Sequence, residues 1–252
     1  MHDDTVTHFL DEGLIESVIR PIKSGKEASV HLCRANPRTT GETLAALKVF
    51  HPLDRRDFRD EQLYRDGEFI KERRIRTALE KKTKFGREVQ GGLWVNREWD
   101  TLSALTARGA PVPRPIERTD DAILMTYVGD LEAAAPQLRS YAADDPEETQ
   151  DLFDQIIGAV QLMLFHDVVH GDLSAYNLLV WDGVVTVIDF PQAVDAKKNG
   201  HAEAFLRRDV ERVVTHFDKL GLQADADTIA GDLWTSWTFA DLVPEELRGL
   251  SL

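Results

Sequence analysis

Hydrophobic and polar positions along the chain predict strands mainly before residue 128 and helices mainly after it. Apolar and β-branched runs bounded by turn residues predict strands at 19–33 with a turn at Ser24-Gly25, at 43–50 and at 122–128. Apolar residues at helical spacing predict helices at 6–12, 93–108, 202–220 and 227–239. This segregation indicates an α+β fold with two lobes, a strand-rich N-lobe at 1–128 and a helical C-lobe at 129–252.

The helix with the clearest start signal begins after Asp145. Asp145 is the predicted N-cap, Pro146 the first helical residue and Glu148 the carboxylate that returns to the cap. Its predicted buried stripe consists of Leu152, Ile156, Val160 and Met163.

The charge of the chain is unevenly distributed. A formal net charge of −14 over 252 residues argues against nucleic-acid binding by the whole surface. The segment 69–87 reverses the sign, with eight basic residues against two acidic ones, and is where an RNA or a ribosomal particle is expected to dock. It lies in a charged stretch, 54–88, that has no apolar face and is predicted to be a flexible insertion in the N-lobe.

Neither a membrane helix nor a signal peptide is indicated. No stretch approaches the roughly 18 to 20 apolar residues that a membrane helix needs, and residues 1–12 are acidic. We therefore expect a cytoplasmic protein. The single cysteine, Cys33, excludes an intrachain disulfide and is interpreted as a buried apolar residue.

A β-hairpin is predicted around residues 182–183. An Asp-Gly pair between two β-rich runs is the strongest short signal of such a turn. If Trp181 pairs with Val184, counting outward brings Asn177 and Asp189 together at the open end of the hairpin. Carboxylate and amide oxygens at such a corner suit a hard cation such as Mg²⁺.

Asp172 enters the same corner from the preceding loop, five residues before Asn177. Phosphoryl transfer needs a metal ion that neutralises the phosphates and a carboxylate that orients the attacking hydroxyl and accepts its proton. We assign Asn177 and Asp189 to the metal and Asp172 to the acceptor hydroxyl. Each residue alone is also common as a turn cap, so the assignment rests on the combination.

Lys48 is the one cation in an otherwise apolar strand, which indicates an anionic partner. Glu98 falls on the inward stripe of the helix at 93–108, four residues from Trp94 and from Leu102, and needs a cation. We expect Lys48 to meet both Glu98 and a nucleotide phosphate. The alternatives are a lysine at an edge strand and a glutamate that reaches water.

The turn at 24–30 is a candidate nucleotide loop. Its backbone N–H groups and the Ser24 and Ser29 hydroxyls are suited to cover phosphates, and Lys26 and Val30 belong to the same loop. It is not a Walker A loop, because Glu27 rather than Ser or Thr follows Lys26.

With these residues, the chain resembles the RIO family of atypical serine/threonine protein kinases from about residue 19 to 220. The loop at 24–30 resembles the family's nucleotide loop, Lys48 its strand lysine, Glu98 its helix glutamate and 170–177 its catalytic loop. The run Ile-Asp-Phe-Pro-Gln at 188–192 stands where ordinary kinases carry Asp-Phe-Gly. The run Phe-Leu-Arg-Arg-Asp at 205–209 resembles the helix that follows directly in this family.

The resemblance implies a reduced protein-kinase-like fold, ATP with Mg²⁺ or Mn²⁺, and autophosphorylation on serine. In some members the metal aspartate, here Asp189, becomes a phosphoaspartate. Met125 and Tyr127 would contact the nucleotide at the hinge. Thr77 and Thr83 are hydroxyl candidates in the flexible loop. Because the nucleotide loop begins at Ser24, we expect a bacterial or archaeal type without an N-terminal winged helix.

Two other functions share these motifs. Small-molecule phosphotransferases of the aminoglycoside or choline kinase type also carry His-Gly-Asp, an asparagine five residues later and a following Ile-Asp-Phe. They usually have a larger helical lobe than the about 60 residues that follow Asp189 here. An ATP-dependent binding switch on a ribonucleoprotein would use the same residues as a kinase.

Overall fold

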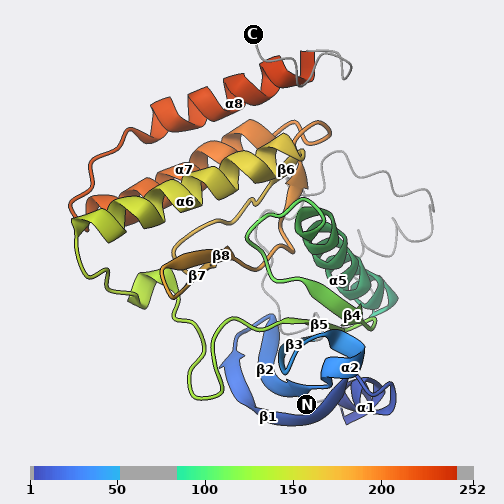
Figure 1. Ribbon diagram of the computed structural model, residues 1–252. Coiled ribbons are helices and arrows are strands. Elements are labelled where there is room, and N and C mark those ends of the chain that lie inside the picture. The colour runs from blue at the N-terminus through green and yellow to red at the C-terminus, as the bar shows by residue number, and fades with distance from the viewer. Residues whose placement is uncertain (1–2, 52–83, 243–252) are drawn as a thin grey trace. The chain divides into compact units, whose positions relative to one another are not determined.

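The computed structural model describes residues 3–51 and 84–242, which group into two compact units (Figure 1). The N-terminal unit holds residues 3–51, 84–136 and 188–191, and the C-terminal unit holds 137–187 and 192–242. Most of the charged stretch at 54–88 and most of the basic segment at 69–87, with Thr77 and Thr83, lie outside the described residues. The lobe boundary at residue 128 stays a prediction.

The N-terminal unit is built on one antiparallel sheet of five strands in the order β1-β2-β3-β5-β4. The strands are β1 (Ile15–Ser24), β2 (Ala28–Ala35), β3 (Leu44–Phe50), β4 (Pro115–Arg118) and β5 (Ala122–Thr126). Three helices accompany them: α1 (Asp3–Asp11), α2 (Pro37–Thr40) and α5 (Lys84–Thr106). The predicted strands are present, and β4 is a further strand that the sequence pattern did not predict.

One hydrophobic core fixes this sheet. Phe9 of α1, Cys33 of β2, Leu47 of β3 and Leu124 of β5 are all fully buried in it. Cys33 is therefore the buried apolar residue that its position in the sequence predicted. Helix α5 packs against β4 and β5, and it begins ahead of the predicted start at residue 93.

The C-terminal unit is mainly helical. Its helices are η2 (Leu138–Ser140), α6 (Pro146–Phe165), α7 (Ala202–Asp218) and α8 (Ala226–Leu242), and α8 contacts both α6 and α7. Two short antiparallel pairs complete it, β6 (Val168–Val169) with β9 (Val194–Asp195) and β7 (Leu178–Trp181) with β8 (Val184–Val187). In α8, Trp234 and Trp237 are only partly buried, whereas Ala230 and Leu233 are buried.

The start of α6 shows both a confirmed and a corrected prediction. Asp145 caps the helix by accepting the backbone N–H of Glu148 at 2.9 Å, and Pro146 is the first helical residue. The side chain of Glu148 does not return to the cap residue itself. It accepts the backbone N–H of Asp144 and the hydroxyl of Tyr141, because the chain before the helix folds back over its first turn.

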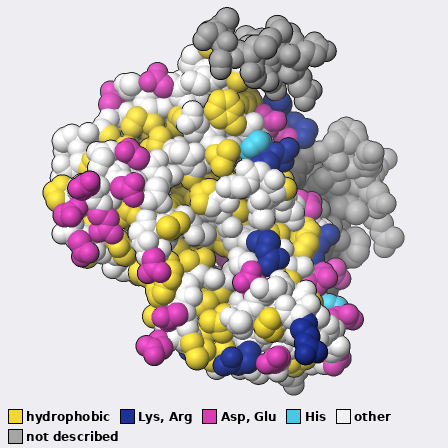
Figure 2. Space-filling model, in the orientation of Figure 1, with side chains coloured by type: hydrophobic (Ala, Val, Ile, Leu, Met, Phe, Trp, Pro, Cys, Tyr) yellow, Lys and Arg dark blue, Asp and Glu magenta, His cyan; other side chains and the backbone are white. Residues whose placement is uncertain are grey.

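Acidic side chains gather where α6 begins, and Figure 2 shows them crowded over this end of the C-terminal unit. The exposed members in this stretch are Asp144, Asp145, Glu147, Asp151 and Asp154. Much of the net negative charge of the chain is thus solvated at one place. Of the helices that the structure describes, none has the length and apolar character needed to cross a membrane.

Candidate active site

Lys48 lies near the middle of β3, paired with Val30 of β2 on one side and Ile123 of β5 on the other. Its side chain is buried. Its Nζ atom donates to both carboxylate oxygens of Glu98, at 2.8 and 2.7 Å, and to Oδ1 of Asp189 at 2.7 Å. The predicted pairing of Lys48 with Glu98 is therefore present, and Asp189 joins it within the same unit.

The two carboxylates differ in access to solvent. The side chain of Glu98 is 2% exposed and that of Asp189 is 41% exposed. Burial alone would lower the pKa of Lys48, but Asp189 and Glu98 outweigh it and raise that pKa above its ordinary value. Lys48 therefore stays charged. Of the two carboxylates that contact it, only Asp189 can meet a ligand from solution without breaking a buried contact.

A short segment, 188–191, carries Asp189. Its backbone is in the left-handed region, with φ of 73°, which Asp tolerates better than most residues. The neighbouring Phe190 is fully buried, and Arg97 of α5 donates to the carbonyl of Pro191 at 3.1 Å. These contacts fix the segment against α5.

The predicted nucleotide loop closes the β1-β2 hairpin. The Gly25 N–H donates to the Ala28 carbonyl at 2.9 Å, and the Ser24 and Ser29 hydroxyls lie 3.3 Å apart. Ser29 also contacts Nε2 of His51 at 3.1 Å. Lys26 is exposed, and Val30 lies in β2 beside Lys48.

The predicted hinge residues follow from β5. Met125 is buried and pairs with Ala46, and the Tyr127 hydroxyl donates to the Ala133 carbonyl at 2.9 Å. Gly129 allows this close loop with a φ of 131°, because a Cβ there would lie 2.5 Å from the carbonyl oxygen of Ala133.

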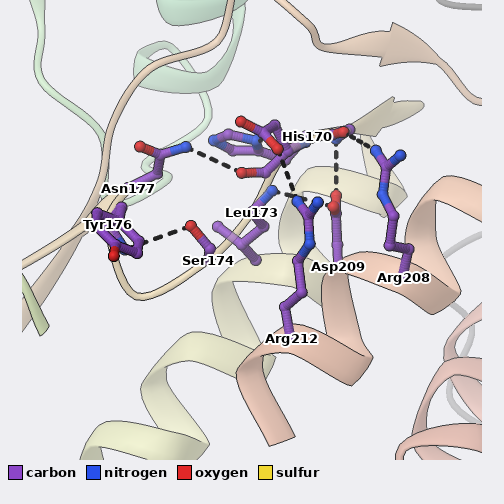
Figure 3. A network of polar contacts seen from close by, with 10 residues as sticks. His170, Leu173, Ser174, Tyr176, Asn177, Arg208, Asp209 and Arg212 are labelled. Atoms are coloured by element: carbon purple, nitrogen blue, oxygen red, sulfur yellow. Dashed lines mark hydrogen bonds and ion pairs between the residues drawn. The ribbon is translucent and has the colours of Figure 1, made fainter. Parts of the chain in front are cut away.

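The catalytic loop candidate precedes the hairpin of the C-terminal unit. The hairpin has the predicted register, with Trp181 paired to Val184 and Leu178 to Val187. Asn177 is buried, and its side-chain nitrogen donates to the Asp172 carbonyl at 2.9 Å (Figure 3). The amide oxygen of Asn177 therefore points the other way and has no hydrogen-bond partner among the described residues.

Side chains of helix α7 contact this loop, as Figure 3 shows. Asp209 is buried and accepts the backbone N–H groups of Gly171 at 2.7 Å and Leu173 at 3.0 Å. Arg208 donates to the Gly171 carbonyl, and Arg212 contacts Oδ1 of Asp172 at 2.7 Å. Burial raises the pKa of Asp209 to about 7, although the two amide donors and the two arginines oppose it.

The sequence interpretation assigned no role to these three α7 residues. A signal existed, because Asp209 lies four residues after Phe205 on the buried stripe of α7, as Glu98 does on its helix. A carboxylate on such a stripe needs donors. Arg212 carries no comparable signal, since it follows Glu211 on the exposed side of α7, where a charged residue needs no partner.

Three comparisons relate the chain to known proteins. A family model described as RIO domain matches residues 33–229. The RIO-type serine/threonine-protein kinase Rio1 of Thermoplasma acidophilum is 37% identical over 137 residues, covering 54% of this chain and 70% of the relative. The protein of that name from Haloferax volcanii is 30% identical over 221 residues, covering 88% of this chain and 70% of the relative.

A solved structure, the Rio2 kinase–ADP/Mg²⁺–phosphoaspartate complex from Chaetomium thermophilum, is similar with a TM-score of 0.67 and 21% identity. The match covers 90% of this chain and 64% of the Rio2 kinase chain. At this identity the likeness bears on the fold, and the predicted α+β, protein-kinase-like fold is confirmed. The roles of the individual site residues remain predictions.

Proposed function

The chain belongs to the RIO family of serine/threonine protein kinases, and we propose which of its residues carry the ATP- and Mg²⁺-dependent phosphoryl transfer. They are Lys48, Glu98, Asp172, Asn177 and Asp189. The observation that carries the proposal is the buried Lys48 between a buried and a half-exposed carboxylate. A buried cation beside a partly exposed carboxylate is suited to hold a phosphate that approaches from the side of Asp189.

Lys48 is proposed to bind a nucleotide phosphate, and Glu98 to orient Lys48. Glu98 holds Lys48 through both oxygens, so the lysine keeps one geometry when a nucleotide arrives. The loop residues Ser24, Lys26 and Ser29, with Val30, Met125 and Tyr127, are proposed to contact the nucleotide. Their support is their position in the strands that flank β3 or directly beside those strands.

We propose from the sequence that Asn177 and Asp189, which flank the two ends of the β7-β8 hairpin, hold a magnesium ion. The oxygen of Asn177 has no partner among the described residues, and Asp189 is partly exposed. Mg²⁺ needs few protein ligands, because it takes its remaining ligands from phosphates and water. Mg²⁺, or Mn²⁺ in its place, would neutralise the phosphate charge.

Asp172 orients the acceptor. A serine or threonine hydroxyl donates its hydrogen bond to the Asp172 carboxylate and attacks the γ-phosphorus. The bond from that phosphorus to the β–γ bridging oxygen breaks, ADP leaves, and the carboxylate receives the hydroxyl proton. The partly exposed side chain of Asp172 supports this role, because an acceptor has to reach it.

Asp189 is a second acceptor candidate. The similar structure from Chaetomium thermophilum is of a phosphoaspartate complex, and Asp189 is the more exposed of the two carboxylates on Lys48. In that reaction an Asp189 oxygen forms the bond to the γ-phosphorus as ADP leaves, and water later hydrolyses the acyl phosphate. This chemistry would serve an ATP-driven switch.

A polyanionic partner is proposed from the sequence alone. The basic segment at 69–87 would bind RNA or a ribosomal particle, and a cytoplasmic location goes with it. Charge reversal at Lys81, Lys82 and Lys84 should weaken RNA binding and flatten its salt dependence. An unchanged affinity for RNA would contradict the proposal that this segment binds it.

The acceptor class is tested by ATP turnover in the presence of Mg²⁺. Purified protein is assayed alone, with casein, and with kanamycin or choline. We expect label from γ-labelled ATP in the protein itself or in casein, and no effect of the small molecules. A strong stimulation by a small hydroxyl compound would replace the protein-kinase assignment with a small-molecule phosphotransferase.

A further inference from the structure

Arg212 and Asp172 form an ion pair that stability does not explain. Arg212 Nη1 lies 2.7 Å from Oδ1 of Asp172, and the two side chains are 41% and 43% exposed. Exposed pairs of this kind typically contribute about 0 to 1 kcal/mol to stability. The pair instead places a positive charge beside Asp172, the carboxylate to which the acceptor hydroxyl is proposed to donate.

The pair also completes a set of contacts from one helix. Arg208, Asp209 and Arg212 project from α7 toward the catalytic loop in Figure 3. The first two bind backbone groups of Gly171 and Leu173. Arg212 binds the carboxylate of Asp172, so α7 contacts both the loop backbone and the Asp172 side chain.

The geometry leaves half of the carboxylate available. Arg212 takes Oδ1, and Oδ2 of Asp172 accepts no hydrogen bond in the part of the chain that the structure describes. A carboxylate held by one oxygen cannot turn freely, so its other oxygen keeps one direction. The positive guanidinium also offsets repulsion between Asp172 and an incoming phosphate.

We infer that Arg212 is a positioning residue for phosphoryl transfer, one that aims Oδ2 of Asp172 at the acceptor hydroxyl. The inference rests on the proposed role of Asp172. It gives Arg212 an effect on the rate of transfer and none on ATP affinity, because its described contact is to Asp172 and not to the sheet that carries Lys48.

The test compares Arg212→Ala, Arg212→Lys and Arg207→Ala in full-length protein. Arg207 is the matched control, because it lies on the same helix with the same exposure but pairs with Glu203 and Asp227. The measurements are the autophosphorylation rate at saturating Mg²⁺-ATP, the ATP concentration for half-maximal rate, and thermal melting.

Arg212→Ala should slow autophosphorylation by about ten- to a hundredfold, the range expected for a misaligned catalytic group. The half-maximal ATP concentration should stay within about twofold, Arg212→Lys should keep an intermediate rate, and added guanidinium at millimolar concentration should partly rescue the alanine variant. Arg207→Ala should match the wild type in rate.

Three outcomes would overturn the inference: an unchanged rate in Arg212→Ala, a faster rate, or a loss confined to ATP affinity. A faster rate would mean that Arg212 blocks Asp172 instead of aiming it. If the wild type incorporates label and Asp172→Asn does not, the proposed function stands whatever Arg212 does. If the wild type incorporates none, both fail.

Discussion

Lys48 and Glu98 form a two-point contact, with Nζ of the lysine 2.8 and 2.7 Å from the two carboxylate oxygens, and both side chains are buried. Removal of one partner leaves an uncompensated buried charge, which typically costs about 3 to 5 kcal/mol. Lys48→Met should therefore lower the free energy of unfolding by about that amount, measured by urea denaturation.

The double variant Lys48→Met with Glu98→Leu separates stability from function. It removes both charges, so much of the lost stability should return, as replacement of buried ion pairs by apolar groups is often neutral. Phosphoryl transfer should stay absent in both variants. If the loss of unfolding free energy in the double variant equals the sum of the losses in Lys48→Met alone and Glu98→Leu alone, Lys48 and Glu98 are not energetically coupled.

Asp209 should make stability depend on pH. Its pKa in the folded protein is about 7, raised by burial, against about 3.9 for an unfolded aspartate. Between about pH 4 and 7 the unfolded chain loses this proton and the folded protein retains it, so the contribution of Asp209 to stability falls as pH rises. Above pH 7 the fall should end.

The measurement is denaturant unfolding from pH 4 to 8 in the wild type and in Asp209→Asn. The variant should be less stable by about 1 to 3 kcal/mol, because the NH2 group of the asparagine amide would face a backbone N–H group where Asp209 presents an oxygen. The difference between the two proteins should shrink with rising pH up to about 7. A difference independent of pH would show that Asp209 does not titrate in this range.

Gly129→Ala should destabilise the N-terminal unit by about 1 to 3 kcal/mol. The added Cβ would lie 2.5 Å from the Ala133 carbonyl oxygen and 2.8 Å from the Tyr127 hydroxyl, at a φ of 131°. Gly221→Ala is the control, since Gly221 also has a positive φ but nothing within 4 Å of its Cβ position. Equal shifts in melting temperature for the two variants would show that the close approach at Gly129 carries no cost of its own.

The parts of the fold and site that the sequence predicted are those fixed by local chemistry. The Asp-Gly turn at 182–183 set the register of β7 and β8, with Asp182 and Gly183 both at positive φ. Lys48 and Glu98 were paired in advance because a charge inside an apolar pattern needs a partner.

The parts that it did not predict depend on contacts distant in sequence. β4 forms because β5 offers its backbone to the segment Pro115–Arg118, and Glu148 binds Asp144 because the preceding chain folds back. Arg212 meets Asp172 across 40 positions, and no periodicity reports such a contact.

The most direct test of the central claim is incubation of purified protein with Mg²⁺ and γ-labelled ATP, with label in the protein measured before and after hydroxylamine. The account predicts label that hydroxylamine spares, as expected for phosphoserine or phosphothreonine, and its loss by about 10² to 10⁴-fold in Asp172→Asn with ATP binding retained. A hydroxylamine-labile fraction absent from Asp189→Ala would identify the acyl phosphate. No label in a wild-type protein that binds ATP, or near-normal label in Asp172→Asn, would contradict the account.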